Sequence, residues 1–327
     1  MGISTKKLVS YLLFIVIGVK RGAKTGEAFS FLAGETKAKI HRFQNKNKIE
    51  ELRRRFEEAL PSDYVYADMA LKLDWVHVYS MCHGGATAEQ KLSILSFLCH
   101  VGTPAKWSIV SDGSISDSQA ESLRSIHPSV EVLDWSTFLC KENRDCYERL
   151  SKYTVFAKKF ALMSNLPVQG AAVYVDSDIL FFEGAHHLTE LLNNLGGKSY
   201  FQKDLPGCLD PSYLTPAELE APHLNAGFVI QGKRLDWSVP IARLNTILSQ
   251  LSPLQTLGDL GVLEQSASHL AHFLAGSAPL DEKYALQVSD QLDEEDRFSG
   301  PNFVMRHYVR PVRHKMWLHS TDYLPRS

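Results

Sequence analysis

The sequence predicts an α/β fold in which helices flank a mostly parallel central sheet. Short runs rich in β-branched and aromatic residues alternate with amphipathic segments of helical length. Connections of that kind give right-handed crossovers and parallel strands. A second observation is the apolar run 171–182, which is interrupted only by Asp176-Ser177-Asp178. We expect this acidic group at the carboxyl end of a central strand, the edge at which open α/β sheets bind ligands.

Composition narrows the class of protein. The chain of 327 residues can bury a large core, and it is 44% hydrophobic and 22% charged, as in soluble globular proteins. A formal net charge of -2 gives no electrostatic reason to expect a nucleic-acid partner. The five cysteines lack the Cys-x-x-Cys spacing of zinc or redox sites. We therefore expect reduced thiols and a cytoplasmic location.

Two regions are expected: a basic, helical N-terminal extension over residues 1–62 and an α/β domain over residues 63–327. The apolar stretch Leu8–Val19 has basic flanks and is too short to span a bilayer. Residues 8–24 fit a helix at a membrane surface, a secretory signal without a convincing cleavage site, or a helix packed on the domain. A peripheral membrane contact through residues 8–24 is therefore one expectation.

Helical spacing of apolar residues predicts one amphipathic helix over residues 36–60, with Ile40, Phe43 and Phe56 on its apolar face. Beyond it, strands are expected at 75–80, 107–110, 130–133, 171–175, 199–202, 223–231 and 302–308, and helices at 88–99, after 116, and at 151–163, 189–195, 239–251 and 261–274.

Local signals refine these elements. Thr87 and Ser116 each have Gln three residues later, which predicts a capping box at both helix starts. In the helix over 151–163 we expect Phe160 on the core face and Lys159 elsewhere. The loop over 203–222 is rich in proline and long enough to shape a substrate site.

The spacing of Asp176 and Asp178 has a chemical meaning. In an extended segment, residues two apart project from the same face, so both carboxylates can converge on one point. Converging carboxylates repel unless a proton or a cation neutralises them, and their oxygens suit Mg²⁺ or Mn²⁺ better than zinc. The alternative is an ordinary turn, because Asp and Ser are common turn residues.

Three further motifs follow in order: Asn225-Ala226-Gly227 at a strand start, Glu264-Gln265 in a helix, and a basic closing segment from His307 to Trp317. With the acidic group, they resemble the glycosyltransferases of GT-A fold, most closely family 8, which includes glycogenin and bacterial lipopolysaccharide galactosyltransferases. The resemblance covers residues 75–317 and implies a single GT-A, Rossmann-like domain.

The resemblance also implies roles for individual residues. The ligands of Mn²⁺, or Mg²⁺, would be Asp176, Asp178 and His307. Residues that contact the nucleotide-sugar donor would be Asp176, Lys158, Asp112, Gly227, Arg313 and Lys315. Residues beside the reacting sugar would be Gln265, Glu264 and Asn225. In the retaining mechanism, the departing phosphate oxygen takes the proton of the acceptor, so no strong protein base is needed.

The implied activity is transfer of a hexose, from a donor expected to be UDP-linked, to a hydroxyl of a glycan, lipid or protein. Glu264 replaces the more usual Asp of the family, and Arg310 stands where Gly is expected. A sugar-nucleotide-binding protein without turnover remains an alternative, as does an inverting transferase, although no base can be chosen among Glu218, Glu220 and Asp259. A haloacid-dehalogenase-type phosphatase fits less well, because its acidic motif lies near the domain start.

Overall fold

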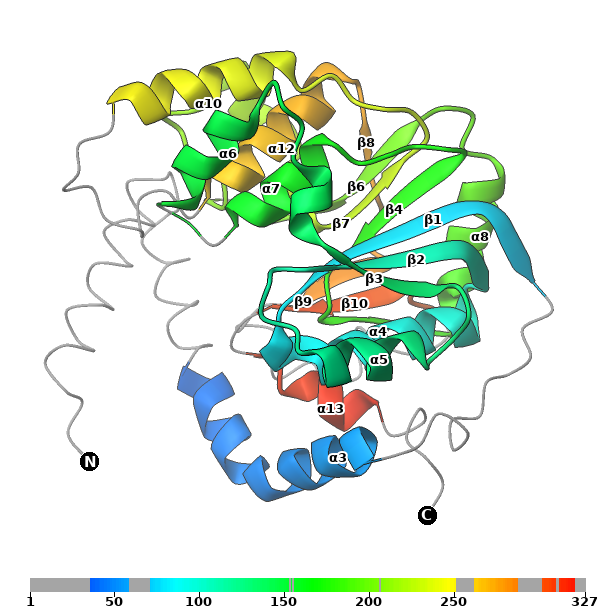
Figure 1. The fold of residues 1–327 in the computed structure, drawn as a ribbon. Helices are drawn as coiled ribbons and strands as arrows, with labels where there is room; N and C mark the ends of the chain where they lie inside the picture. Colours follow the sequence, from blue (N-terminus) through cyan, green and yellow to red (C-terminus); the bar gives the residue numbers. More distant parts are fainter. Residues whose placement is uncertain are drawn as a thin grey trace, which may run out of the picture.

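The computed structural model describes residues 36–58, 71–152, 154, 156–205, 207–250, 262–287, 302–309 and 312–320. Within these residues the main sheet has seven strands in the spatial order β3-β2-β1-β4-β7-β6-β8 (Figure 1). The strands are β1 (Lys72–Cys82), β2 (Thr103–Ser111), β3 (Val130–Asp134), β4 (Ala171–Val175), β6 (Ser199–Lys203), β7 (Leu224–Gln231) and β8 (Ala278–Pro279).

The sheet is mostly parallel, as predicted. The neighbours β3, β2, β1 and β4 pair in parallel, and so do β6 and β8. Strand β7 runs antiparallel to both β4 and β6. Four neighbouring strands are parallel because a helical connection returns the chain, after each strand, to the end of the sheet at which that strand began. These connections contain α4 (Thr87–His100), α5 (Asp117–Arg124), α6 (Arg144–Ser151) and α7 (Ala157–Ser164).

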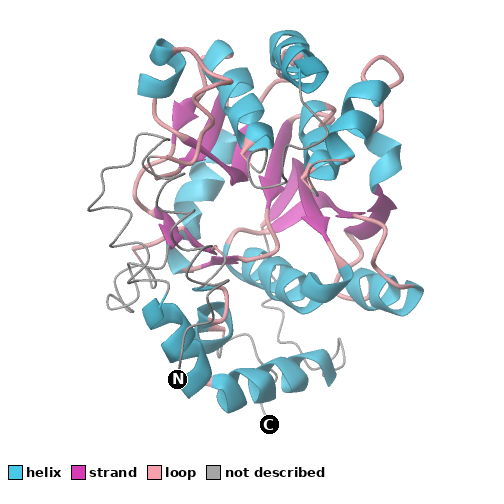
Figure 2. Cartoon of the chain, turned by 90° about the vertical axis from the view of Figure 1, so that its left-hand side faces the viewer, coloured by secondary structure: helices cyan, strands magenta, loops and turns pink. Residues whose placement is uncertain are grey.

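Helices cover both faces of this sheet (Figure 2). The remaining helices of the domain are α8 (His186–Asn193), α9 (Pro216–Glu220), α10 (Ser238–Gln250), α12 (Leu263–Leu274) and α13 (Lys315–His319). Along β4, Val173 and Val175 belong to the core that includes α4 and α8. The alternate residues Ala172 and Tyr174 belong to the core that includes α7, α10 and α12. Strand β4 is therefore buried on both faces, which explains its continuous apolar sequence.

A second, three-stranded sheet adjoins the first and has the order β5-β10-β9. Its strands are β5 (Ile179–Phe181), β9 (Tyr284–Gln287) and β10 (Met305–Tyr308). Strand β10 pairs antiparallel with β5, and His307 lies opposite Ile179. The strand expected over 302–308 begins at Met305, later than predicted. This pairing brings the end of the domain beside the acidic group.

The described part of the N-terminal extension packs on the domain. It forms a helix over residues 36–44, a turn at Asn45, and α3 (Lys46–Glu58), not one continuous helix. Phe56 is buried, and its ring centroid lies 5.7 Å from that of Trp317 in α13. Helix α13 lies beside α3 (Figure 1). The single apolar face was a wrong prediction, because the turn leaves Ile40 53% and Phe43 78% exposed.

Two expectations about the extension fall outside the described residues: the boundary at residue 62 and the membrane contact through residues 8–24. Among the helices that are described, none combines the length and the apolar composition that crossing a membrane requires.

Local predictions had mixed outcomes. The capping box at Ser116 is confirmed. The one at Thr87 is wrong: the 3-10 turn Gly84–Ala86 runs straight into α4, so Thr87 has helical dihedral angles and cannot cap. The helix over 151–163 is also wrong, because α6 ends at Ser151 and α7 starts at Ala157. The intervening run of aromatic and β-branched residues has low helix propensity.

Candidate active site

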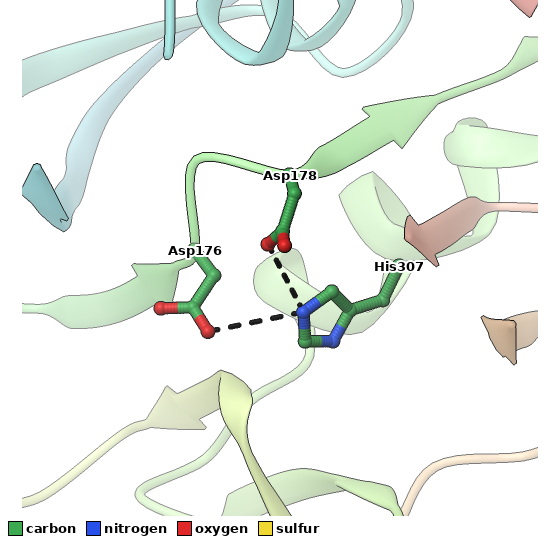
Figure 3. Close-up of side chains that lie close together, drawn as sticks. All are labelled: Asp176, Asp178 and His307. Atoms are coloured by element: carbon green, nitrogen blue, oxygen red, sulfur yellow. Dashed lines mark hydrogen bonds and ion pairs between the residues drawn. The ribbon is translucent and has the colours of Figure 1, made fainter. Parts of the chain in front are cut away.

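Three side chains expected to bind a metal converge in the structure. Figure 3 shows Asp176 and Asp178 on the link between β4 and β5, with His307 pointing at both from β10. One ligand atom from each residue lies within 4.8 Å of the other two. Nε2 of His307 is 3.2 Å from Asp178 Oδ1 and 3.8 Å from Asp176 Oδ2. The link crosses from one sheet to the other, so its carboxylates lie at the junction of the two sheets.

Gly227 allows the side chains of the site to pack closely at this junction. A Cβ atom placed on Gly227 would lie 2.2 Å from His307 Cε1 and 2.8 Å from both Asp176 Oδ2 and Asn225 Oδ1. No side chain fits there without moving the ligand groups. The donor set of carboxylate oxygens and one imidazole nitrogen fits Mn²⁺ or Mg²⁺. The absence of a side chain at Gly227 lets these groups come together.

Asp178 is held in its ionised form. Its side chain is nearly buried, and burial alone would raise the pKa of this carboxyl. The neighbouring His307 and the guanidinium of Arg313 outweigh burial and lower the pKa of Asp178 instead. Nε of Arg313 donates to Asp178 Oδ2 at 2.8 Å. The closing segment therefore reaches the acidic pair through two residues, His307 and Arg313.

Asp176 forms an ion pair with a different residue, Lys159, which the sequence did not lead us to expect. The ammonium of Lys159 in α7 lies 3.0 Å from Asp176 Oδ1 and 3.1 Å from Oδ2, and the hydroxyl of Tyr174 donates to Oδ1 at 2.7 Å. Burial lowers the pKa of Lys159, but Asp176 and Glu264 raise it overall. The prediction that Lys159 points away from the core is wrong. It assumed a helix with one buried face, whereas α7 is buried on nearly all sides.

The adjacent Lys158, expected to contact the donor, lies elsewhere. Its ammonium donates to the backbone carbonyl of Asp112 and lies 5.3 Å from the ring centroid of Trp135. The carboxylate of Asp112 accepts hydrogen bonds from the backbone and hydroxyl of Ser114, at 2.9 and 2.6 Å. Asp112 therefore closes the turn that follows β2. The two residues form a group beside the first strands, separate from the contacts of the acidic pair.

A second cluster brings together residues expected beside the reacting sugar. Asp204, directly after β6, accepts hydrogen bonds on Oδ2 from Gln265 Nε2 at 2.8 Å and from Asn225 Nδ2 at 2.9 Å. Sequence reasoning missed Asp204, although its place at a strand end was the available signal. Burial raises the pKa of this carboxyl, and the hydrogen bonds counteract part of that effect. The amide groups from β7 and α12 are thus fixed by one carboxylate.

Glu264 is buried next to this cluster. Burial raises the pKa of Glu264 to about 7, with Lys159 lowering it and Asp176 raising it further. Its Oε1 has no hydrogen-bond partner in the described part of the chain. A carboxyl that is protonated near neutral pH can donate a hydrogen bond as well as accept one.

Lys315, also expected at the donor, is completely buried in α13.

Comparisons with known proteins give structural likenesses alone. No protein-family model matches the sequence, and no curated protein matches it. Among solved structures, the chain is similar to the apo form of mouse xyloside xylosyltransferase 1, with a TM-score of 0.47 and 13% identity over 72% of this chain and 97% of that one.

Two further similar structures are a galactosyltransferase and another glycosyltransferase. Galactosyltransferase LgtC, in complex with donor and acceptor sugar analogues, has a TM-score of 0.48 and 11% identity over 77% of this chain and 97% of that one. Apo GlyE from Streptococcus pneumoniae TIGR4 has a TM-score of 0.46 and 13% identity over 75% of this chain and 60% of that one.

Proposed function

We propose that this chain is a metal-dependent glycosyltransferase of the GT-A type, most similar to family 8. It would transfer a hexose from a UDP-linked donor to a hydroxyl acceptor with retention of configuration. One observation supports this function above others: Asp176, Asp178 and His307 converge, with one ligand atom of each within 4.8 Å of the others, beside a glycine that leaves room for them. Asn225, expected beside the sugar, lies against the same glycine, because its Oδ1 would be 2.8 Å from a Cβ on Gly227, as would Asp176 Oδ2.

The residues of the chain have distinct tasks in this proposal. Asp176, Asp178 and His307 would hold Mn²⁺ or Mg²⁺, which when bound supplies positive charge to the leaving diphosphate. Asn225 and Gln265 present amide groups whose orientation Asp204 fixes through two hydrogen bonds. Fixed dipoles of this kind favour the charged transition state because they need no reorganisation during the reaction.

Glu264 and Arg313 complete the proposed site. As a protonated, buried carboxyl, Glu264 can donate a hydrogen bond to a sugar hydroxyl and so orient the donor. Arg313 orients the oxygens of Asp178, and its guanidinium adds positive charge near the leaving group. The proton of the acceptor hydroxyl passes to the departing phosphate oxygen. A cytoplasmic location stays a prediction, which rests on the scattered spacing of the five cysteines in the sequence.

A second candidate function has its own supporting observation. Lys159 pairs with Asp176, and Arg313 pairs with Asp178, so protein cations already neutralise both carboxylates. Such pairing is compatible with a sugar-nucleotide-binding protein that has no turnover. Metal-dependent hydrolysis of a UDP-sugar separates the two functions, because a binding protein would bind UDP without cleaving the donor.

The proposed function is tested by replacing Asp178. In Asp178→Asn, which keeps the shape of the side chain, we expect loss of Mn²⁺-dependent UDP binding by calorimetry and loss of donor hydrolysis. Asp74→Asn serves as the control, because Asp74 is exposed on β1. If Asp178→Asn binds UDP and Mn²⁺ as the unmodified protein does, the proposed site is wrong. Thermal stabilisation by UDP-, GDP- and CMP-sugars then identifies the nucleotide, since a bound ligand stabilises by mass action.

A further inference from the structure

A cavity of about 600 Å³ lies between the N-terminal extension and the domain. Its walls come from the helix over residues 36–44, from α3, from the segment after β1, from the start of α4, and from the closing segment. Arg313 lines this cavity and also donates to Asp178, so the cavity and the acidic pair share one side chain. The volume is in the range of small-molecule sites. The extension thus borders a space next to the proposed metal ligands.

Among the charged side chains on the walls of the cavity, the cationic ones are in the majority. They outnumber the carboxylates, which are Glu50 and Glu89, and they comprise Lys39, Arg42, Lys46, Arg53 and Arg313. Lys46 lies 3.7 Å from Glu50, but both side chains are more than half exposed, so this pair is weak. A recess lined mainly by one sign of charge concentrates ions of the other sign. The cavity therefore favours an anionic ligand.

Glu89 adds a second requirement. It is 5% exposed, and its Oε1 accepts a hydrogen bond from Trp317 Nε1 at 3.2 Å and faces Arg53 Nη1 at 3.5 Å. Its other oxygen, Oε2, is buried without a hydrogen-bond partner among the described residues. A buried carboxylate oxygen is costly unless a donor reaches it. A ligand with a free hydroxyl group would supply that donor.

We propose that this cavity binds a phosphate ester with free hydroxyl groups, its phosphate held by Arg42, Lys46 and Arg313. Two sources have this chemistry. One is the nucleotide part of the donor bound at the acidic pair, and this source rests on the proposed function. The other is a separate sugar phosphate, which does not. In either case the extension forms part of a ligand site and is more than a packed appendage.

The test measures binding of UDP and of glucose 6-phosphate to the full chain by calorimetry, each with and without Mn²⁺. The variants are Arg42→Glu and Lys46→Glu, singly and together. Lys48→Glu is the matched control: it makes the same charge change in α3, is exposed, and does not line the cavity. Because each contact is charge-assisted, we expect roughly a tenfold or greater loss of affinity in the double variant. The control should match the unmodified protein.

Each outcome has a definite meaning. Weaker UDP binding in the presence of Mn²⁺ assigns the cavity to the donor nucleotide. Weaker glucose 6-phosphate binding, with or without the ion, assigns it to a separate ligand. The proposal is overturned if the cavity variants bind both esters as tightly as the control does. It is also overturned if the unmodified chain binds neither ester. If only the proposed function is wrong, UDP binding will not depend on Mn²⁺, while weaker glucose 6-phosphate binding in the cavity variants will still support the cavity proposal.

Discussion

The side-chain oxygen of Gln202 lies 3.1 Å from Nδ1 of His307 in the buried space between the two sheets. The amide nitrogen of Gln202 donates to the carbonyls of Tyr284 and Ala285, at 3.1 and 3.0 Å. With its nitrogen committed to two acceptors, the oxygen of Gln202 must face the imidazole. Nδ1 of His307 therefore carries a proton and donates it, which fixes the ring so that Nε2 faces Asp178.

Gln202→Leu should weaken Mn²⁺ binding by about 10- to 100-fold, the usual effect of removing the partner that orients a metal-binding histidine. Mn²⁺ affinity can be measured by electron paramagnetic resonance. Gln231→Leu is the control, since Gln231 is a buried glutamine on β7 outside the contacts of His307. Equal Mn²⁺ affinity in the two variants would mean that Gln202 does not position the imidazole.

Gly227→Ala should abolish Mn²⁺ binding and lower the free energy of unfolding by about 1–3 kcal/mol, because the added Cβ overlaps His307 and must displace it. Denaturant unfolding and metal titration measure the two effects. Gly113→Ala is the control that separates loss of stability from loss of metal binding. The backbone angle φ of Gly113 is +94°, so alanine is strained there, yet nothing lies within 4 Å of the new methyl group. That variant should lose stability and keep its metal affinity.

Lys159→Met should destabilise the metal-free protein by about 2 kcal/mol, because it removes the cation beside Asp176. The cost stays below that of a fully buried pair, since the Asp176 side chain is 25% exposed. Added Mn²⁺ should restore part of the loss by supplying the missing positive charge. Lys152→Met, at an exposed position after α6, should unfold at nearly the same denaturant concentration as the unmodified protein. A similar destabilisation in both variants would contradict the assigned role of Lys159.

Because the pKa of Glu264 is raised, we expect the stability of the protein to depend on pH. Burial raises the pKa of Glu264 in the folded protein to about 7, from 4.5. Between these values the folded state holds a proton that the unfolded state has lost, so the free energy of unfolding falls as pH rises from 4.5 to 7. The full change is about 3 kcal/mol. Glu264→Gln cannot titrate, so its unfolding free energy in metal-free buffer should lack this decrease. Parallel pH profiles for the two proteins would refute the prediction.

The strands and the acidic pair follow from local patterns. The apolar run before Asp176 is enough to predict a buried strand that ends in the acidic pair. The two carboxylates converge as predicted, but the predicted reason is wrong, because Ser177 and Asp178 form a turn and not an extended segment. The alternation of strands and helices likewise predicts a mostly parallel sheet. These features depend on residues close together in sequence, so periodicity and spacing report them directly.

The partners of the site residues depend on tertiary structure instead. Lys159 reaches Asp176 because α7 is buried on nearly all sides, so that Lys159 is enclosed together with Phe160. Asp204 and Gln202 act through contacts with residues far along the chain. The failed cap at Thr87 has the same origin, since the preceding turn, not the local motif, sets its backbone angles.

Asp178 and His307 stand 129 residues apart in the chain, and their strands β5 and β10 are joined by backbone pairing. The N–H of Tyr308 donates to the carbonyl of Asp178 at 2.8 Å. During translation at ordinary speed, roughly 6–25 s pass between addition of the two residues. Until β10 is synthesised, the growing chain has both acidic side chains without their histidine, so a ribosome that stops before residue 305 leaves a product unable to form the three-residue centre.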